Sequence, residues 1–285
     1  MIQTVGILTI ACPDRRGLVA SVTSFLYEHG ANILDSNQHS DLAAGVFFMR
    51  VAFDLAGMTL ARNEIASAFE TVGQKFGMDW QLRFADELKN VAILVSQQDH
   101  CLYDLLLRHR AGEFQVNISL VISNHSTLEP IAQSFGVEWH YLPTPPDTKA
   151  QQEAAILALL AQHKIDLVVL ARYMQILSPT IVKQYRWRII NIHHSLLPAF
   201  VGAKPYHQAY ERSVKIIGAT AHYVTAELDE GPIIVQDVAK VSHRDSVQDL
   251  VRRGRDLERQ VLAQAVKAHL EDRVLVSGRR AIVFD

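Results

Sequence analysis

The first 84 residues alternate between short apolar runs and two longer segments in which apolar side chains recur at helical spacing. In the first segment, 18–30, residues such as Leu18 and Val22 fall on one face, and Gly30 provides a stop. The same helical spacing of apolar residues over 60–77 predicts a second helix. Four further runs have the composition of strands, at 2–10, 31–40, 44–53 and 78–85. This order predicts a ferredoxin-like βαββαβ unit, a sheet with both helices on one face.

The rest of the chain follows a different pattern, in which continuous apolar runs are separated by helical segments. The clearest helix spans 147–164, and a long helix with a charged outer face is predicted over 246–274. The apolar runs predict strands at 91–96, 116–123, 137–143, 165–173 and 188–195, then an antiparallel pair at 213–224 and 232–241, and a last strand at 279–285. Continuous apolar strands joined by crossover helices predict an α/β domain with a Rossmann-like, mostly parallel, doubly wound sheet.

A polar stretch, ADELKN at 85–90, separates the two patterns. We therefore expect the ferredoxin-like domain to cover 1–84 and the doubly wound domain to cover 91–285, with 85–90 as the linker. In a mostly parallel sheet, ligands bind beyond the carboxyl ends of the strands. Polar residues at predicted strand ends, such as Ser123 and Asn191, therefore indicate where a site lies.

The run NIHHSLLPAF at 191–200 places polar side chains where a buried strand ends. Asn191 and His193 are two residues apart, so on extended backbone they point to the same side. An amide N–H can stabilise an oxyanion while an imidazole moves protons, which suits acyl chemistry. Asp229, in the loop LDEG, is the candidate carboxylate partner for His193, and His222 lies on the strand that leads into this loop.

Two less specific interpretations stay open at this point. A histidine at a strand end is often structural, and an aspartate in a glycine-containing hairpin often serves the turn alone. A metal-hydrolase site built from the tandem histidines with His207, His222 and Asp229 is the other alternative. Because His193 and His194 point to opposite faces of a strand, the sequence does not favour a shared metal, and we expect none.

Composition narrows the class of protein without naming a reaction. The chain has 285 residues, 49% hydrophobic and 20% charged, which is typical of a globular protein. A formal net charge of −2 gives no general attraction to nucleic acid or anionic membranes. Cys12 and Cys101 lack metal-site or redox spacing, and the N-terminal run is cut short by Pro13. We therefore expect a cytoplasmic protein.

Residues 191–238, NIHHSLLPAFVGAKPYHQAYERSVKIIGATAHYVTAELDEGPIIVQDV, closely resemble the folate-dependent formyltransferase fold, and most of all the formyltetrahydrofolate deformylases. The resemblance extends over the whole chain and implies an N-terminal ACT domain before a formyltransferase-fold domain. It implies hydrolysis of 10-formyltetrahydrofolate to formate and tetrahydrofolate, without a cofactor, in support of purine biosynthesis. In that family the matching catalytic residues are Asn191, His193 and Asp229.

The resemblance also implies where folate binds. Related enzymes hold the pterin mainly through main-chain groups, which here correspond to segments 172–177 and 225–229. The residues expected to contact folate are Arg172, Tyr173, Met174, Leu177, His222, Thr225 and Glu227.

Two sister enzymes share the catalytic triplet. Glycinamide ribonucleotide formyltransferase holds its substrate phosphate on a glycine-rich loop, whereas the matching stretch here, LVSQQDHCLYDLL, has no glycine. Methionyl-tRNA formyltransferase carries a further RNA-binding domain, whereas this chain ends at Asp285 with a net charge that does not suit tRNA. We therefore expect water as the acceptor and transfer to an amine such as glycinamide ribonucleotide as the alternative.

The N-terminal domain has two interpretations. It is either an assembly module or an amino-acid sensor, for which the ACT resemblance points to Asp14, Gly17 and Asn32. Glycine or methionine is the expected effector of a one-carbon enzyme, and a homodimer or homotetramer is the expected assembly. An alternative of another class is a non-catalytic folate-binding or amino-acid-binding regulator.

Overall fold

The computed structural model describes residues 5–145, 147–198 and 205–285. Its contacts divide the chain into two compact units, and the first comprises the chain up to Leu88 together with 271–275 and 282–285. The second comprises 89–270 and 276–281. Lys89 and Asn90, expected in the linker, begin a strand of the second unit.

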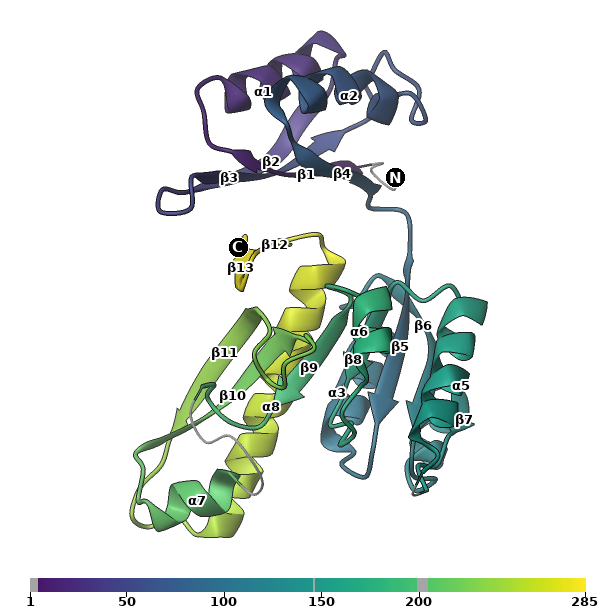
Figure 1. Cartoon of the computed structure of the whole chain (residues 1–285), viewed down its shortest axis with the longest axis vertical. Coiled ribbons are helices and arrows are strands. Elements are labelled where there is room, and N and C mark those ends of the chain that lie inside the picture. Colours follow the sequence, from purple (N-terminus) through teal and green to yellow (C-terminus); the bar gives the residue numbers. More distant parts are fainter. Residues whose placement is uncertain (1–4, 146, 199–204) are drawn as a thin grey trace. The chain divides into compact units, whose positions relative to one another are not determined.

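The N-terminal unit has the predicted βαββαβ order (Figure 1). Its elements are β1 (Val5–Pro13), α1 (Leu18–Glu28), β2 (Asn32–Asp41), β3 (Val46–Asp54), α2 (Ile65–Phe76) and β4 (Asp79–Phe84). The sheet order is β2-β3-β1-β4, with β3 antiparallel to both of its neighbours and β4 antiparallel to β1. Both helices cover one face of the sheet. Residues 2–4 of the first predicted strand lie outside the described residues.

The core of this unit follows the predicted helical spacing. Leu18, Val22 and Leu26 are buried on the inner face of α1 against the sheet. The start predicted for α2 is wrong, because residues before Ile65 form a turn in which the Glu64 carboxylate accepts a hydrogen bond from the backbone N–H of Ala61 (2.9 Å). A carboxylate that reaches back three residues to a backbone N–H marks the start of a helix, because that N–H has no partner within the helix.

The second unit is built on a seven-stranded sheet in the order β11-β10-β9-β8-β5-β6-β7. Its strands are β5 (Lys89–Val95), β6 (Val116–Ser123), β7 (Glu138–Tyr141), β8 (Leu167–Leu170), β9 (Ile189–His193), β10 (Ile216–Tyr223) and β11 (Ile233–Lys240). β5 to β9 are parallel, whereas β10 and β11 run antiparallel to their neighbours. The predicted mostly parallel sheet is therefore confirmed.

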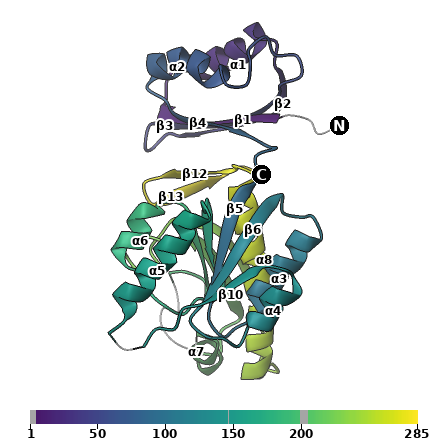
Figure 2. The ribbon, with the colours of Figure 1, turned by 90° about the vertical axis from the view of Figure 1, so that its right-hand side faces the viewer.

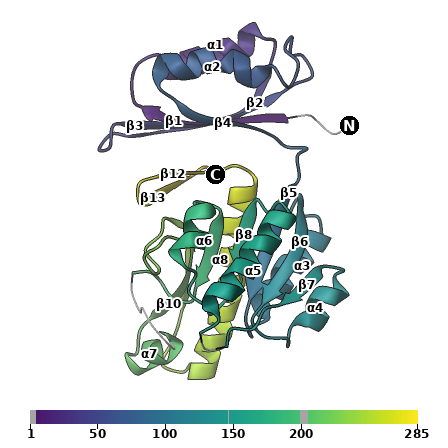
Figure 3. The same ribbon diagram turned by 45° about the vertical axis from the view of Figure 1, so that its right-hand side comes forward.

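Helices cover both faces of this sheet. They are α3 (His100–Arg110), α4 (Glu129–Ser134), α5 (Lys149–Gln162), α6 (Pro179–Gln184), α7 (Pro205–Glu211) and α8 (Val247–Leu270). Figures 2 and 3 show α5 and α6 on one face and α3 and α8 on the other. Among the described residues, no helix is long and apolar enough to span a membrane.

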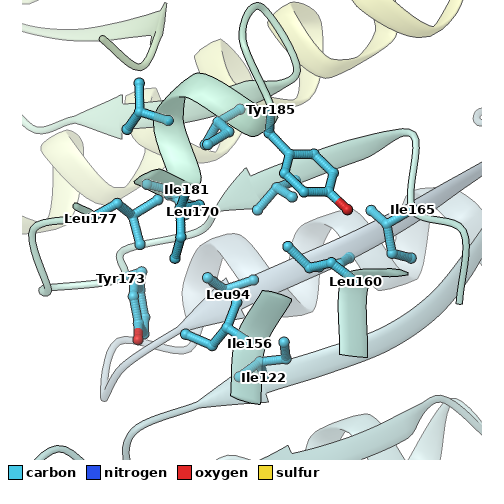
Figure 4. Packing of buried hydrophobic residues seen from close by; sticks show 14 of the residues in the cluster. Leu94, Ile122, Ile156, Leu160, Ile165, Leu170, Tyr173, Leu177, Ile181 and Tyr185 are labelled. Carbon is cyan, nitrogen blue, oxygen red and sulfur yellow. The ribbon is translucent and has the colours of Figure 1, made fainter. Parts of the chain in front are cut away.

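Successive side chains along each strand point to opposite faces of the sheet, so a continuous apolar strand places apolar side chains on both faces. On β5, Ala92 and Leu94 belong to a buried cluster that includes side chains of α5 and α6, and Figure 4 shows Leu94 within it. From α5, Ile156 and Leu160 pack into the same cluster. Each buried leucine or isoleucine of this cluster contributes roughly 1.5–3 kcal/mol through burial, which stabilises the strands whose ends carry the site.

The C-terminal end of the long helix corrects one prediction. The helix predicted over 246–274 ends at Leu270, because Asp272 takes a left-handed conformation (φ 52°) that a helix cannot continue. The chain then forms a hairpin of β12 (Val274–Ser277) and β13 (Arg280–Val283). Gly278 (φ 56°) supplies its turn.

Candidate active site

Strand β9 places two of the predicted catalytic residues on one face. Asn191 and His193 occupy alternate positions, so both side chains point to the same side of the sheet. On the neighbouring strand β10, His222 lies opposite Asn191 and Thr220 lies opposite His193. Strand pairing therefore brings His222 to the Asn191 amide.

His222 sets the direction of that amide. Its Nδ1–H donates to the carbonyl oxygen of Tyr223 (2.9 Å), because a carbonyl can only accept. The neutral ring therefore presents a lone pair at Nε2, and Nδ2 of Asn191 lies 3.2 Å from it and donates to it. The second N–H of the Asn191 amide can donate to a ligand in the cavity that Asn191 lines.

Asp229 reaches His193 from the loop between β10 and β11. Its Oδ2 lies 3.2 Å from Nδ1 of His193, which is hydrogen-bond distance. The backbone at Asp229 is left-handed (φ 57°), a conformation that aspartate tolerates better than most residues. Gly231 helps to close the loop, because a Cβ there would overlap the carbonyl oxygen of Tyr223. Two separate segments thus bring Asp229 and His193 together.

The Asp229 carboxylate is ionised at neutral pH. The hydrogen bond from His193 is the main cause that holds the pKa of Asp229 well below its ordinary value, against the opposing effect of burial. Oδ1 lies 3.6 Å from Nε2 of His222, longer than a hydrogen bond, so the His193 contact fixes the carboxylate. Its charge orients the His193 ring and stabilises the imidazolium form.

The other ring nitrogen of His193 is free to act. Nε2 is buried and makes no hydrogen bond within the part of the chain that the structure describes. Because Nδ1–H of His193 donates to Asp229, the neutral ring carries its lone pair on Nε2. This nitrogen can therefore accept a proton from water in the adjacent cavity and pass it on.

A cavity of about 680 Å³ opens beside these groups. This volume suits a ligand of cofactor size. Asn191, His193 and Asp229 line it. Every residue predicted to contact folate lines it as well, namely Arg172, Tyr173, Met174, Leu177, His222, Thr225 and Glu227. The structure brings the predicted residues together, and their roles in catalysis and folate binding stay predictions.

Comparison with known proteins identifies the family. The formyl transferase family model matches residues 89–266, and the ACT domain model matches residues 6–70. The formyltetrahydrofolate deformylase of Synechocystis sp. is 53% identical over 277 residues, which cover 97% of both chains. This chain belongs to the formyltetrahydrofolate deformylase family. A solved deformylase from Pseudomonas syringae pv. tomato matches with a TM-score of 0.97 and 47% identity, covering 99% of this chain and 95% of that one.

Glycinamide ribonucleotide transformylases match a smaller part of this chain. The structure from Symbiobacterium toebii has a TM-score of 0.65 and 35% identity, and covers 70% of this chain and 95% of its own. The deformylases match the ACT unit as well as the catalytic fold. The comparisons therefore favour the deformylase prediction over the transformylase alternative and confirm the predicted ACT domain.

His194 differs from its neighbour in environment and charge. Its ring meets those of His193 and Tyr206 edge to face, with centroids 5.2 Å and 6.3 Å away. Burial lowers the pKa of His194 to about 4, and the positive charge of Arg172 acts in the same direction. His194 is therefore neutral near pH 7, which leaves His193 as the candidate proton carrier of the tandem pair.

We expect His194 to make the folded protein sensitive to moderate acid. Below pH 6.5 the unfolded chain takes up a proton that the folded chain excludes until about pH 4, so stability falls as pH falls. Between pH 7 and pH 5, the free energy of unfolding should drop by about 2 kcal/mol more in the wild type than in His194→Gln. Urea unfolding at both pH values measures this difference. Exposed His243→Gln is the matched control, and equal slopes in all three proteins would contradict the prediction.

Sequence reasoning missed a polar cluster in the wall of the cavity. Glu258 of α8 is 1% exposed, accepts a hydrogen bond from Tyr206 (2.6 Å) and lies 2.8 Å from Nε2 of His100. Nε of Arg172 lies 3.5 Å from the same carboxylate. Burial would raise the pKa of Glu258, but the His100 hydrogen bond and the Arg172 charge outweigh it and lower the pKa. One feature of the sequence could have indicated the cluster, because Glu258 is a charged residue on the apolar stripe of α8 beside Leu257.

Gly254 makes room for this cluster, and its substitution gives a second prediction. A methyl group at position 254 would overlap the ring and hydroxyl of Tyr206. On an exposed helix Gly→Ala stabilises by about 1 kcal/mol, but here we expect Gly254→Ala to destabilise by roughly 1–3 kcal/mol. Thermal unfolding checks this, and an unchanged or raised Tm would contradict it. Gly254→Ala combined with Tyr206→Phe tests whether the hydroxyl is the obstacle.

Two groups of potential metal ligands occur among the described residues, and neither includes the predicted catalytic triplet. One is His100, Cys101 and Glu258, where the nearby Arg172 guanidinium disfavours a cation. The other is Glu138, His140 and His163, whose side chains do not line the cavity.

The predicted effector residues lie in the ACT unit. Asp14 and Asn32 are exposed, and Gly17 takes φ 91° immediately before α1. The positive φ explains a glycine at that position. Binding of an amino acid at these residues stays a prediction.

Proposed function

We propose that this protein hydrolyses 10-formyltetrahydrofolate to formate and tetrahydrofolate, with water as the acceptor. The observation that carries the proposal is the contact of Asp229 with Nδ1 of His193, which leaves the buried Nε2 free at the cavity. Asn191 adds an amide donor on the same side of the strand. The names and full-length similarity of the relatives support the same substrate.

In this proposal each of the three residues has one task. The Asn191 N–H donates to the formyl oxygen as attack by water makes it an oxyanion. Nε2 of His193 takes a proton from the water and delivers a proton to N10 of the leaving tetrahydrofolate. Asp229 stabilises the imidazolium between these two transfers. His222 positions the Asn191 amide through its hydrogen bond.

Folate binding uses the walls of the same cavity. Apolar side chains such as Leu177 and the buried Tyr173 give a surface for the pterin, and main-chain groups of 172–177 and 225–229 supply its hydrogen bonds. Burial raises the pKa of Tyr173 to about 12, so its hydroxyl stays protonated as a donor. No cofactor or metal takes part in the proposed reaction.

One assay tests the proposal against its alternatives. The purified protein is incubated with 10-formyltetrahydrofolate, with and without glycinamide ribonucleotide, and formate and tetrahydrofolate are measured. Equal release of both without the amine, unchanged by EDTA, is the expected result. Product formation only with the amine would show formyl transfer, and loss of activity in EDTA would show that the reaction needs a metal. No turnover with or without the amine would favour the alternative of a non-catalytic binding protein.

The proposal includes regulation through the ACT unit. Glycine or methionine is the proposed effector, bound near Asp14, Gly17 and Asn32, in a cytoplasmic dimer or tetramer whose formate supports purine biosynthesis. The match of the ACT domain model to residues 6–70 supports this part. Titration with either amino acid should change activity or Tm in the wild type and not in Asp14→Ala. If neither amino acid changes activity or Tm, the interpretation of the ACT unit as an assembly module would be favoured.

A further inference from the structure

The Arg172 guanidinium is an unsatisfied cation in the cavity wall. Its side chain is only 13% exposed, yet it makes no hydrogen bond within the described residues. Among the described residues its one ion contact places Nε 3.5 Å from the Glu258 carboxylate, and that Nε is buried without a hydrogen-bond partner. Buried N–H groups are nearly always paired, so a guanidinium with open donors indicates a missing acceptor.

The backbone at Arg172 strengthens this point. Arg172 has φ 63°, a left-handed conformation that costs a bulky residue about 1 kcal/mol and that glycine adopts freely. The turn is also tied down, because the Met174 N–H donates to Oγ of Ser96 (3.0 Å) and the Ser96 N–H donates to the Arg172 carbonyl (3.3 Å). The conformation directs an arginine side chain into the wall at an energetic cost, which indicates a role for the guanidinium itself.

Glu258 makes this buried charge tolerable without satisfying it. Both oxygens of its carboxylate are already occupied, one by Tyr206 and the other by His100. The negative charge therefore offsets the Arg172 cation at 3.5 Å while leaving the guanidinium donors open to a ligand.

The guanidinium also lies within electrostatic reach of the reacting end of the cavity. Arg172, His193 and Asp229 line the same cavity, and the Arg172 charge acts on His194, the residue next to His193. A planar guanidinium binds a carboxylate through two parallel hydrogen bonds, which a small planar anion can use fully.

We infer that Arg172 is the formate-binding residue of the hydrolytic site. The inference rests on the proposed function and adds a ligand to one wall of the same cavity. Water forms a C–O bond to the formyl carbon and the N10–C bond breaks. One proton of the water goes to N10 through His193, and the other is released when formic acid ionises. The resulting carboxylate is the anion that the open donors of Arg172 accept.

The test measures formate itself. Binding of ¹³C-labelled sodium formate to the substrate-free protein is followed by NMR, with sodium chloride at equal ionic strength as reference. Affinity for formate should fall at least about tenfold in Arg172→Gln, and Arg172→Lys should lie between, because lysine keeps the charge and loses the paired donors. Arg172→Gly suits the left-handed backbone and should also lose formate, which keeps the test valid if the glutamine variant is poorly folded.

The matched control is Arg255→Gln. Arg255 lines the same cavity, but it is exposed and donates to Oε1 of Gln98 (2.9 Å), so formate affinity should not change. Wild-type formate affinity retained by the Gln and Gly variants, with or without a lower Tm, overturns the inference, as does absence of formate binding by the wild type. Failure to release formate from 10-formyltetrahydrofolate overturns the proposed function instead, so the two failures are distinguishable.

Discussion

Replacement of Asp229 by asparagine should lower kcat/KM for 10-formyltetrahydrofolate hydrolysis by about 10²–10⁴. The amide keeps the size of the carboxylate but removes the charge that stabilises the His193 imidazolium. It can also present an N–H to Nδ1 and turn the ring into the wrong tautomer. Asparagine tolerates the left-handed backbone at this position (φ 57°), so the fold should persist. Steady-state kinetics with a Tm measurement checks both parts.

The same loop supplies the control for this substitution. Glu230 is the next residue, but its carboxylate is exposed and pairs with Arg279 at the surface (2.7 Å). Glu230→Gln therefore changes the net charge by the same amount as Asp229→Asn without touching the cavity, and it should retain near-normal turnover. Equal, small effects of the two variants would show that Asp229 acts only through general charge, and the assignment would be wrong.

The fold could be predicted from the sequence because its signals are local. The continuous apolar run of β5 and the helical spacing along α1 each lie within a few residues, and both appear in the buried core as predicted. Errors fell where one backbone angle or one side-chain bond decides the outcome. The end of α8 depends on the left-handed Asp272, and the start of α2 depends on Glu64.

Some features of the candidate site could likewise be predicted from local sequence, and others could not. The shared side of Asn191 and His193 follows from their spacing on one strand, but their distance from Asp229 depends on how the loop after β10 folds back. The sequence suggested that partner from its place in the LDEG loop and from the family resemblance, whereas the 3.2 Å contact depends on the tertiary fold. The tautomer of His222 depends on a carbonyl contact that no residue pattern reveals.

The cluster around Glu258 shows what sequence reasoning leaves out. Its members come from widely separated positions, and each has an ordinary local interpretation. Arg172 was predicted as a folate contact because the family resemblance places the pterin against segment 172–177, yet its geometry is that of a buried cation beside Glu258. Only the hydrogen-bond inventory of the folded chain shows its donors to be open.

Asn191→Ala should lower kcat for the same hydrolysis by about 10²–10³, with a smaller change in KM, because the amide hydrogen bond strengthens as the formyl oxygen becomes anionic. The neighbouring His222 loses the donor to its Nε2, so a modest fall in Tm should accompany the loss. Steady-state kinetics on the folded variant, with Tm measured in parallel, separates the two effects.

Asn191→Asp decides whether the amide N–H is the active group. Aspartate preserves size and strand geometry but offers only acceptors to the reacting oxygen, so its kcat should be at least as low as that of the alanine variant. It would also place a second carboxylate near Asp229, which opposes oxyanion formation further. An aspartate variant with substantial activity would mean that Asn191 positions His222 and does not bind the oxyanion, and the donor would then have to come from the main chain or from His193 itself.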